Sequence, residues 1–118
     1  MSGRQRQRPS RGEVWQVGLD PLKGREQSGS RPAMIISVDK FNHGPAELAI
    51  VIPITKRHKN ITSHVFVPKG EAGLDVDSYI KVEDIRSVSI ERLIKYRGDL
   101  TYPRIDQVQY ILRVLLGL

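Results

Sequence analysis

Two polar stretches of the sequence carry most of the side chains that could act on a substrate. The first is REQSGSRP, residues 25–32, which holds two arginines, a carboxylate, an amide and two hydroxyls around one glycine. The second is TKRHK, residues 55–59, in which a threonine precedes a run of basic side chains. Arg31 offers a planar fork of donors that fits a phosphate, and Thr55 adds a hydroxyl. The stretches therefore indicate an anion site; in the alternative, Arg31 pairs with Glu26 to tie the loop and the basic run is a solvated turn.

Other kinds of catalytic site have little support in the sequence. The chain has no cysteine, which excludes a disulfide framework, a thiolate zinc site and a cysteine nucleophile. Its histidines, His43, His58 and His64, occur in none of the paired spacings that bind metals. The glycine-containing stretch lacks the Lys-Ser/Thr end of a Walker-type phosphate loop. We therefore expect no metal, no cofactor and no nucleotide hydrolysis.

The positive charge is concentrated at the N-terminus. The formal net charge of +6 suggests a polyanionic partner, but 4 arginines precede the first acidic residue, Glu13. We expect residues 1–10 to form a basic, disordered leader, with a phosphate-touching arm as the alternative. Residues 11–118 are long enough for one domain. No apolar run suits a secretory signal or a membrane helix, so we expect a cytoplasmic protein without a membrane partner.

Short strands are predicted over the first two thirds of the chain. They are residues 13–19, 33–38, 48–54, 63–68 and 78–82. The second and third are nearly continuous apolar runs, whereas the others alternate polar and apolar residues with period two. Pro53 places the end of its strand at an edge or a bulge, because proline cannot donate to a ladder. This series of short strands indicates a small, strongly curved sheet or barrel.

Two helices are predicted after the strands. SIERLIKY, residues 89–96, opens with a serine that can cap a short helix, and Pro103 stands where a helix tolerates proline best. From there to Leu116, apolar residues recur at helical spacing and leave polar residues for the other face. This amphipathic helix of about four turns would close the open side of the sheet or meet a second subunit, and we favour the first role.

The predicted strand order brings the two polar stretches together. If residues 33–38 pair with 13–19 on one side and with 48–54 on the other, the start of one strand faces the end of the next. Arg31 then lies close to Thr55. The basic cluster that follows Thr55 consists of Lys56, Arg57, His58 and Lys59.

Several motifs, taken in order, resemble one known family. They are RGEVW at residues 11–15, GREQSGSRP at 24–32, VIPIT at 51–55 and SYIKVEDIRS at 78–87. Together they are similar to the MazF/PemK/Kid family of toxin endoribonucleases, from about Arg11 to the C-terminus. The resemblance implies a mainly β (α+β) fold: a small SH3-like barrel of about five to seven short strands, with a short helix and a C-terminal amphipathic helix. It also implies that residues 11–118 are a single MazF-like toxin domain that forms a homodimer, whose contacts we place in residues 77–93 and the last helix.

The function implied by this resemblance is that of a sequence-specific, metal-independent endoribonuclease toxin that cleaves single-stranded RNA. A cognate antitoxin with an acidic, flexible tail would neutralise it. The family's phosphate-binding arginine and threonine match Arg31 and Thr55. Its loop motif matches Glu26, Gln27 and Gly29. The other candidates for RNA binding are Arg25, Ser28, Ser30, Lys56, Arg57, His58 and Lys81, whereas the aromatic Trp15, Phe66 and Tyr79 are expected to pack in the core.

The cleavage chemistry follows from what the site lacks. Without a metal or a protein nucleophile, the attacking group is the substrate's own 2′-hydroxyl, which gives a 2′,3′-cyclic phosphate and a 5′-hydroxyl end. The general base stays open between Glu26 and Glu83. Some members of the family have a histidine at the position of Arg25. Other members have an R-x-D triplet where this sequence has Lys81, Val82 and Glu83. Two other functions also stay open: a CcdB-like gyrase poison and a non-catalytic nucleic-acid-binding barrel.

Overall fold

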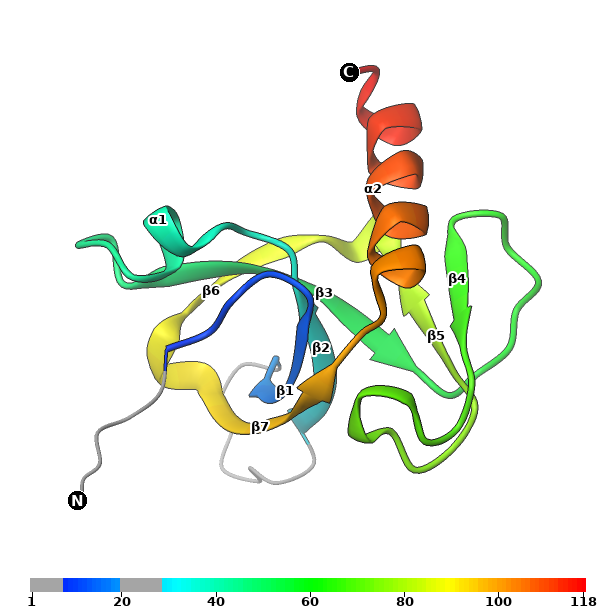
Figure 1. Ribbon diagram of the computed structural model, residues 1–118, viewed down its shortest axis with the longest axis horizontal. Helices are drawn as coiled ribbons and strands as arrows, with labels where there is room; N and C mark the ends of the chain where they lie inside the picture. Colours follow the sequence, from blue (N-terminus) through cyan, green and yellow to red (C-terminus); the bar gives the residue numbers. More distant parts are fainter. Residues whose placement is uncertain (1–7, 20–28) are drawn as a thin grey trace.

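The structure is a computed structural model that describes residues 8–19 and 29–118 (Figure 1). Its strands are β1 Glu13–Gly18, β2 Ser30–Ile35, β3 Leu48–Thr55, β4 His64–Val67, β5 Ser78–Lys81, β6 Arg86–Ser89 and β7 Leu93–Asp99. Its α-helices are α1 Asp39–Asn42 and α2 Tyr102–Leu116, and its 3-10 turns include η2 Glu71–Gly73, η3 Val82–Asp84 and η4 Ile90–Arg92. In the described residues, no helix is long and apolar enough to cross a membrane.

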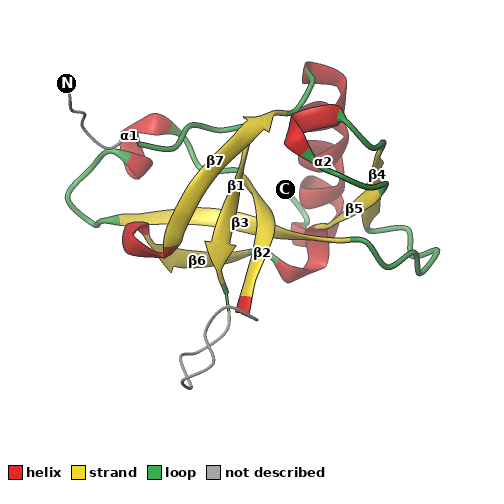
Figure 2. Ribbon diagram, turned by 90° about the horizontal axis from the view of Figure 1, so that it is seen from below, coloured by secondary structure: helices red, strands yellow, loops and turns green. Residues whose placement is uncertain are grey.

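The strands form one antiparallel sheet of 7 strands in the order β4-β5-β3-β2-β1-β7, with β6 also paired to β3. The long strand β3 makes this arrangement possible, because its first half pairs with β6 and its last two residues pair with β5. Figure 2 shows β7, β1 and β2 running across β3 and β6. Within the described residues β4 and β7 are not paired with each other, so the sheet is strongly curved but open. The predicted mainly β fold is confirmed.

Apolar residues on both faces of the sheet form two core clusters. Val14, Met34 and Ile52 belong to one cluster, while Ala33 and Val51 belong to the other. Neighbouring residues of one strand point to opposite faces, so a strand that is buried on both faces needs an apolar residue at every position. This explains the continuous apolar runs of β2 and β3.

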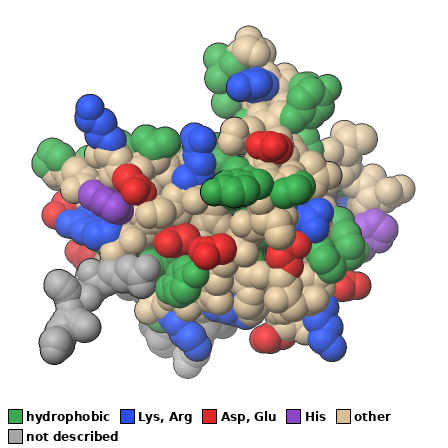
Figure 3. All heavy atoms as spheres, in the orientation of Figure 1, with side chains coloured by type: hydrophobic (Ala, Val, Ile, Leu, Met, Phe, Trp, Pro, Cys, Tyr) green, Lys and Arg blue, Asp and Glu red, His purple; other side chains and the backbone are tan. Residues whose placement is uncertain are grey.

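Helix α2 covers one of these clusters. Thr101 caps the helix by accepting a hydrogen bond from the backbone N of Arg104 (3.4 Å), and Gly117 ends it in the left-handed conformation (φ 71°). Val108 is fully buried against the sheet. The core role is thereby confirmed for one face of α2, but the exposed apolar residues of the helix are Tyr102, Tyr110, Val114, Leu115 and Leu116. Figure 3 shows apolar side chains on both flanks of the helix.

The predicted helix over residues 89–96 is wrong. Ser89 does cap a turn, since its hydroxyl accepts a hydrogen bond from the backbone N of Glu91 (3.4 Å), but the turn is only η4. The chain then enters β7, which pairs with β1 from Glu13↔Asp99 to Val17↔Leu93. The free edge of β1 offers these residues backbone hydrogen bonds, which their local sequence pattern does not predict. This tertiary pairing overrides their local helical pattern. The pattern of residues 86–89 likewise did not predict β6, which forms by tertiary pairing with β3. Strand β2 begins at Ser30, earlier than predicted.

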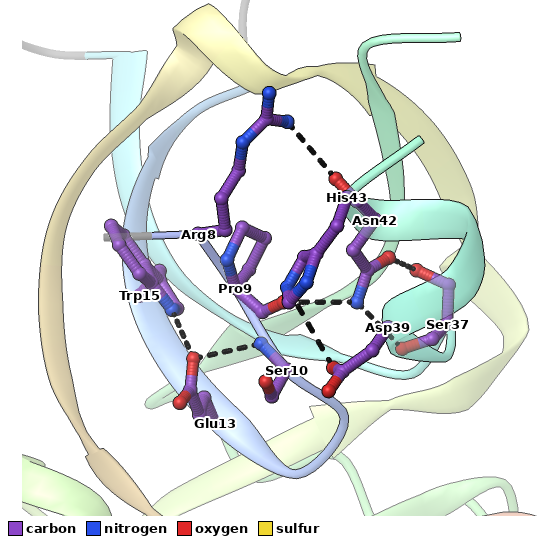
Figure 4. A network of polar contacts seen from close by, with 9 residues as sticks. All are labelled: Arg8, Pro9, Ser10, Glu13, Trp15, Ser37, Asp39, Asn42 and His43. Carbon is purple, nitrogen blue, oxygen red and sulfur yellow. Dashed lines mark hydrogen bonds and ion pairs between the residues drawn. The ribbon is translucent and has the colours of Figure 1, made fainter. Parts of the chain in front are cut away.

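A buried polar network joins α1 to the segment before β1 (Figure 4). The side chain of Asn42 is fully buried, and its Nδ2 donates to the carbonyl oxygens of Pro9 (3.2 Å) and Ser37 (2.8 Å). The Ser37 hydroxyl in turn donates to Asn42 Oδ1. Nearby, Glu13 Oε1 accepts from the indole of Trp15 (2.9 Å), which gives the RGEVW motif a structural role. Each buried polar group in this network therefore has a partner.

The same network holds the end of the segment that we expected to be a disordered leader. Arg8 donates to the carbonyl oxygen of Asn42 (3.2 Å), and Pro9 is fully buried. Residues 8–10 thus pack against α1 and belong structurally to the domain. The rest of the predicted leader, residues 1–7, lies outside the described part of the chain.

An ion pair fastens η2 to the start of α2. Glu71 accepts from Arg104 through both oxygens (2.9 and 3.3 Å) and from the backbone N of Thr101 (3.2 Å). The hydrogen bond from Arg104 is the largest influence on the pKa of Glu71 and, although burial opposes it, the net effect is a pKa below the usual 4.5.

We expect Glu71→Gln to lower the free energy of unfolding by about 1–2 kcal/mol at pH 7, because charge-assisted hydrogen bonds are lost. A depressed folded pKa stabilises the protein fully above the unfolded pKa of about 4.5, and this contribution is lost as the pH falls through the folded value. Melting curves of both proteins between pH 3 and 7 should therefore converge in acid. A difference in melting temperature that stays constant over this pH range would show that the ionised carboxylate of Glu71 is not the source of the stabilisation.

Candidate functional site

Arg31 and Thr55 lie side by side at the ends of β2 and β3. The two strands pair in the register Ala33↔Pro53, and continuing this register by two residues places Arg31 opposite Thr55. The side chain of Arg31 is exposed, and Thr55 is half-buried. Thr55 Oγ1 accepts a hydrogen bond from the backbone N of Arg57 (3.1 Å), so its own hydrogen remains free to point elsewhere. The structure thus brings together the two residues that strand order predicted to meet.

Two adjoining hollows open beside this pair, and both are lined by Arg31, Thr55 and Arg57. The first hollow has a volume of about 630 Å³ and extends towards Asp75 and Arg97. The second, of about 440 Å³, extends along the other side of Thr55. Its charged lining residues are Arg31, Arg57, Lys59, Lys81, Glu83, Asp84 and Arg86, with His64 beside them. Cations outnumber carboxylates in the second hollow, which favours an anionic ligand there.

Glu83 is held as a carboxylate in the second hollow. Ser63 donates to its Oε1 (2.6 Å), and the Nε2 of His64 lies 2.9 Å from its Oε2. Burial raises the pKa of Glu83, but the hydrogen bonds from Ser63 and His64 outweigh this, and the net pKa lies below the usual 4.5. The group is therefore ionised at neutral pH.

His64 is a member of the site that the sequence did not single out. Its side chain is only 4% exposed, and its Nδ1 is the one buried side-chain polar atom without a hydrogen-bond partner in the described residues. The sequence offered only a lone histidine at a strand end, 19 residues from Glu83. Histidine spacing was informative only about metals, and among the described residues no three His, Asp or Glu side chains group as metal ligands would.

The remaining candidates fall into three groups. Lys56, Arg57 and His58 are exposed in the loop between β3 and β4, as expected of residues that contact a ligand. The second group makes contacts within the protein. Lys81 lines the second hollow and forms an ion pair with Asp84 (3.0 Å). The Ser30 hydroxyl accepts a hydrogen bond from the side-chain amide of Gln16 (2.7 Å), and the Gly29 carbonyl accepts one from the backbone N of Leu19 (3.0 Å). Arg25, Glu26, Gln27 and Ser28 lie outside the described residues. The alternative pairing of Arg31 with Glu26 therefore stays a prediction.

Comparison with known proteins identifies the family. The sequence model of the PemK-like, MazF-like toxins of type II toxin-antitoxin systems matches residues 10–116, almost the whole chain. The chain belongs to this MazF-like toxin family. The family predicted from the motifs is thereby confirmed, and the Arg31–Thr55 pair lies within the matched range.

Relatives of this MazF-like toxin agree with the assignment. The chain is 34% identical over 113 residues to a protein named Endoribonuclease MazF9 from Mycobacterium tuberculosis (strain ATCC 25618 / H37Rv), covering 92% of this chain and 96% of the relative. The fold of the present chain is similar to that of MazF from Deinococcus radiodurans, with a TM-score of 0.80 and 24% identity. The match covers 96% of the present chain and 100% of the Deinococcus chain. A mycobacterial endoribonuclease in complex with its cognate antitoxin gives a TM-score of 0.76 at 20% identity, with coverage of 93% and 96%.

Proposed function

We propose that this MazF-like toxin is a sequence-specific endoribonuclease that cleaves single-stranded RNA without a metal ion. The observation that carries the proposal is the placement of Arg31 opposite Thr55 at the edge of a cationic hollow that also contains an ionised carboxylate. The endoribonuclease activity in the name of the mycobacterial relative supports the same reaction class. A gyrase poison or a passive binding barrel has no need of this combination.

In the proposed reaction the 2′-oxygen of one ribose attacks the adjacent phosphorus. The new bond closes a 2′,3′-cyclic phosphate while the bond from phosphorus to the 5′-oxygen breaks. The 2′-hydroxyl proton passes to a carboxylate base, and the leaving 5′-oxygen takes up a proton from water. Arg31 neutralises the non-bridging oxygens through its planar fork of donors. Thr55 donates its hydroxyl hydrogen to one of them, since its oxygen is held by the backbone N of Arg57. Both groups act by stabilising charge that develops on the phosphate.

We assign the general base to Glu83, with Glu26 as the competing residue. Glu83 shares the second hollow with Arg31 and Thr55, and both its oxygens are positioned by hydrogen bonds. We expect Glu83→Gln to lower kcat/KM about 10²-fold, a typical contribution of a positioned base. Glu26→Gln is the matched control and should retain most activity.

The pH profile of kcat/KM tests the same assignment. Because the pKa of Glu83 lies below 4.5, the wild-type rate should not fall on acidification until the pH drops below about 4.5. An acid limb between pH 6 and 7 would identify a different titrating group, and a full loss of activity in Glu26→Gln alone would move the base to that residue.

The partners of the chain are also part of the proposal. MazF from Deinococcus radiodurans has been crystallised with MazE, and the cationic second hollow suits the acidic, flexible tail that we expect of a cognate antitoxin. The exposed apolar side chains of Tyr110, Val114 and Leu115 on α2 support a homodimer. Light scattering at micromolar concentration should give twice the mass of one chain, and a monomer mass would contradict the dimer.

The deciding experiment incubates the purified protein with a long single-stranded RNA in excess chelator and maps the new ends. We expect cuts at one short sequence, with 2′,3′-cyclic phosphate and 5′-hydroxyl termini. Intact RNA would contradict the proposal and favour a gyrase poison or a binding barrel. Cleavage that needs added metal, or that leaves 5′-phosphate ends, would reject the mechanism while keeping the nuclease.

A further inference from the structure

A row of side chains crosses four neighbouring strands and begins at the candidate catalytic pair. The pairing of β3 with β5 places Thr55 opposite Tyr79, and the pairing of β5 with β4 places Tyr79 opposite Phe66. Residues that are directly opposite in an antiparallel sheet project from the same face. Arg31, Thr55, Tyr79 and Phe66 therefore follow one another on one face, in the strand order β2-β3-β5-β4 that Figure 1 shows.

The outer part of this row is a continuous aromatic surface. The ring of His58 stacks on Tyr79 with centroids 4.9 Å apart and planes inclined by 17°, and Phe66 contacts Tyr79 with centroids 5.5 Å apart. Phe66 is 44% exposed, so the expectation that it packs in the core is wrong, and Tyr79 is only half-buried. The alternation of β4 explains this, because Val65 and Val67 take the inward positions. We call His58, Tyr79 and Phe66 the aromatic strip.

The surroundings of the aromatic strip are cationic. His58 belongs to the same exposed loop as Lys56, Arg57 and Lys59, and Arg57 and Lys59 also line the second hollow. An exposed Phe beside these charges is costly to leave in water and gives little to the core. Cationic side chains that follow a phosphate backbone, combined with aromatic rings that receive bases, are what proteins use to bind single-stranded nucleic acid.

We propose that the aromatic strip is a stacking site for a base of the RNA strand that passes Arg31 and Thr55. The inference rests on the proposed function and adds a subsite to it. Neighbouring strands lie about 4.8 Å apart, so Tyr79 stands about 5 Å and Phe66 about 10 Å from Thr55, within reach of the nucleotides next to the bound phosphate. Every base has a π-face, so the strip contributes affinity on one side of the cut and leaves the choice of sequence to the polar loop residues.

Binding of a fluorescent, non-cleavable 2′-O-methyl oligonucleotide of mixed sequence tests the aromatic strip independently of catalysis. We expect Phe66→Leu and Tyr79→Leu to weaken binding about 5-fold or more, because each ring normally contributes that much per stacked base. Tyr79→Phe should bind like the wild type, since it keeps the ring. Tyr102→Leu removes an 83% exposed aromatic ring from α2, which is not part of the aromatic strip, and should also leave binding unchanged.

An abasic nucleotide, introduced at each position in turn, locates the stacked base. One position should weaken binding to the wild type, and Phe66→Leu or Tyr79→Leu should remove that penalty. Unchanged affinity in both leucine variants, with thermal melts showing that they are folded, would overturn the proposal that the aromatic strip stacks on a base.

The same variants distinguish this proposal from the proposed cleavage. If the wild type binds through the aromatic strip but leaves RNA intact, the proposed cleavage is rejected and the stacking site is kept. If both leucine variants cleave and bind RNA normally, the stacking site is rejected and the proposed cleavage is kept.

Discussion

Arg31→Ala is expected to lower the rate of RNA cleavage about 10²- to 10³-fold, the usual effect of removing one donor from a developing oxyanion. The side chain is exposed at the start of β2, so its loss should not disturb the fold. The decrease should appear mainly in kcat, because the guanidinium binds most strongly to the charge of the transition state. Single-turnover cleavage of a short RNA that carries the mapped site measures this directly.

Two variants serve as controls for Arg31→Ala. Arg31→Lys keeps the charge but loses the planar fork, so its rate should be intermediate. Arg113→Ala removes one positive charge from the exposed part of α2 and should cleave like the wild type. If Arg31→Ala raised KM alone, Arg31 would be a general phosphate contact; if it changed nothing, the alternative of a loop tie to Glu26 would be favoured.

A single 2′-deoxy nucleotide on the 5′ side of the cleaved bond should abolish cleavage. This substitution removes the proposed nucleophile and leaves the phosphate and both bases in place, so the reaction has no attacking group. The modified RNA should still compete with the normal substrate at a similar concentration. End mapping of matched RNAs, one modified at the cut and others one nucleotide away, measures the effect.

The outcome separates two kinds of nuclease. RNAs modified next to the cut should be cleaved at nearly the normal rate, because their 2′-hydroxyl at the reacting ribose is intact. Cleavage of the RNA modified at the cut itself would show that water is the nucleophile, and the site would then need a different arrangement to activate it.

Most strands could be predicted from local pattern, whereas β6 and β7 could not. β1, β3, β4 and β5 lie close to their predicted positions, because alternation or continuous apolar character reports which faces of a strand are buried. β7 has only partly buried and exposed residues. It is a strand because the edge of β1 is free to pair with it.

The sequence by itself determined the family, the mainly β fold and the pair Arg31 and Thr55. These features depend on short motifs and on strand ends, where alternation and chain order suffice to place side chains. Only the tertiary structure brought His64 to Glu83 and turned Phe66 outward beside Tyr79. The reason is physical: both contacts join segments that are far apart in sequence, and only the pairing of β4 with β5 in one particular register makes them neighbours.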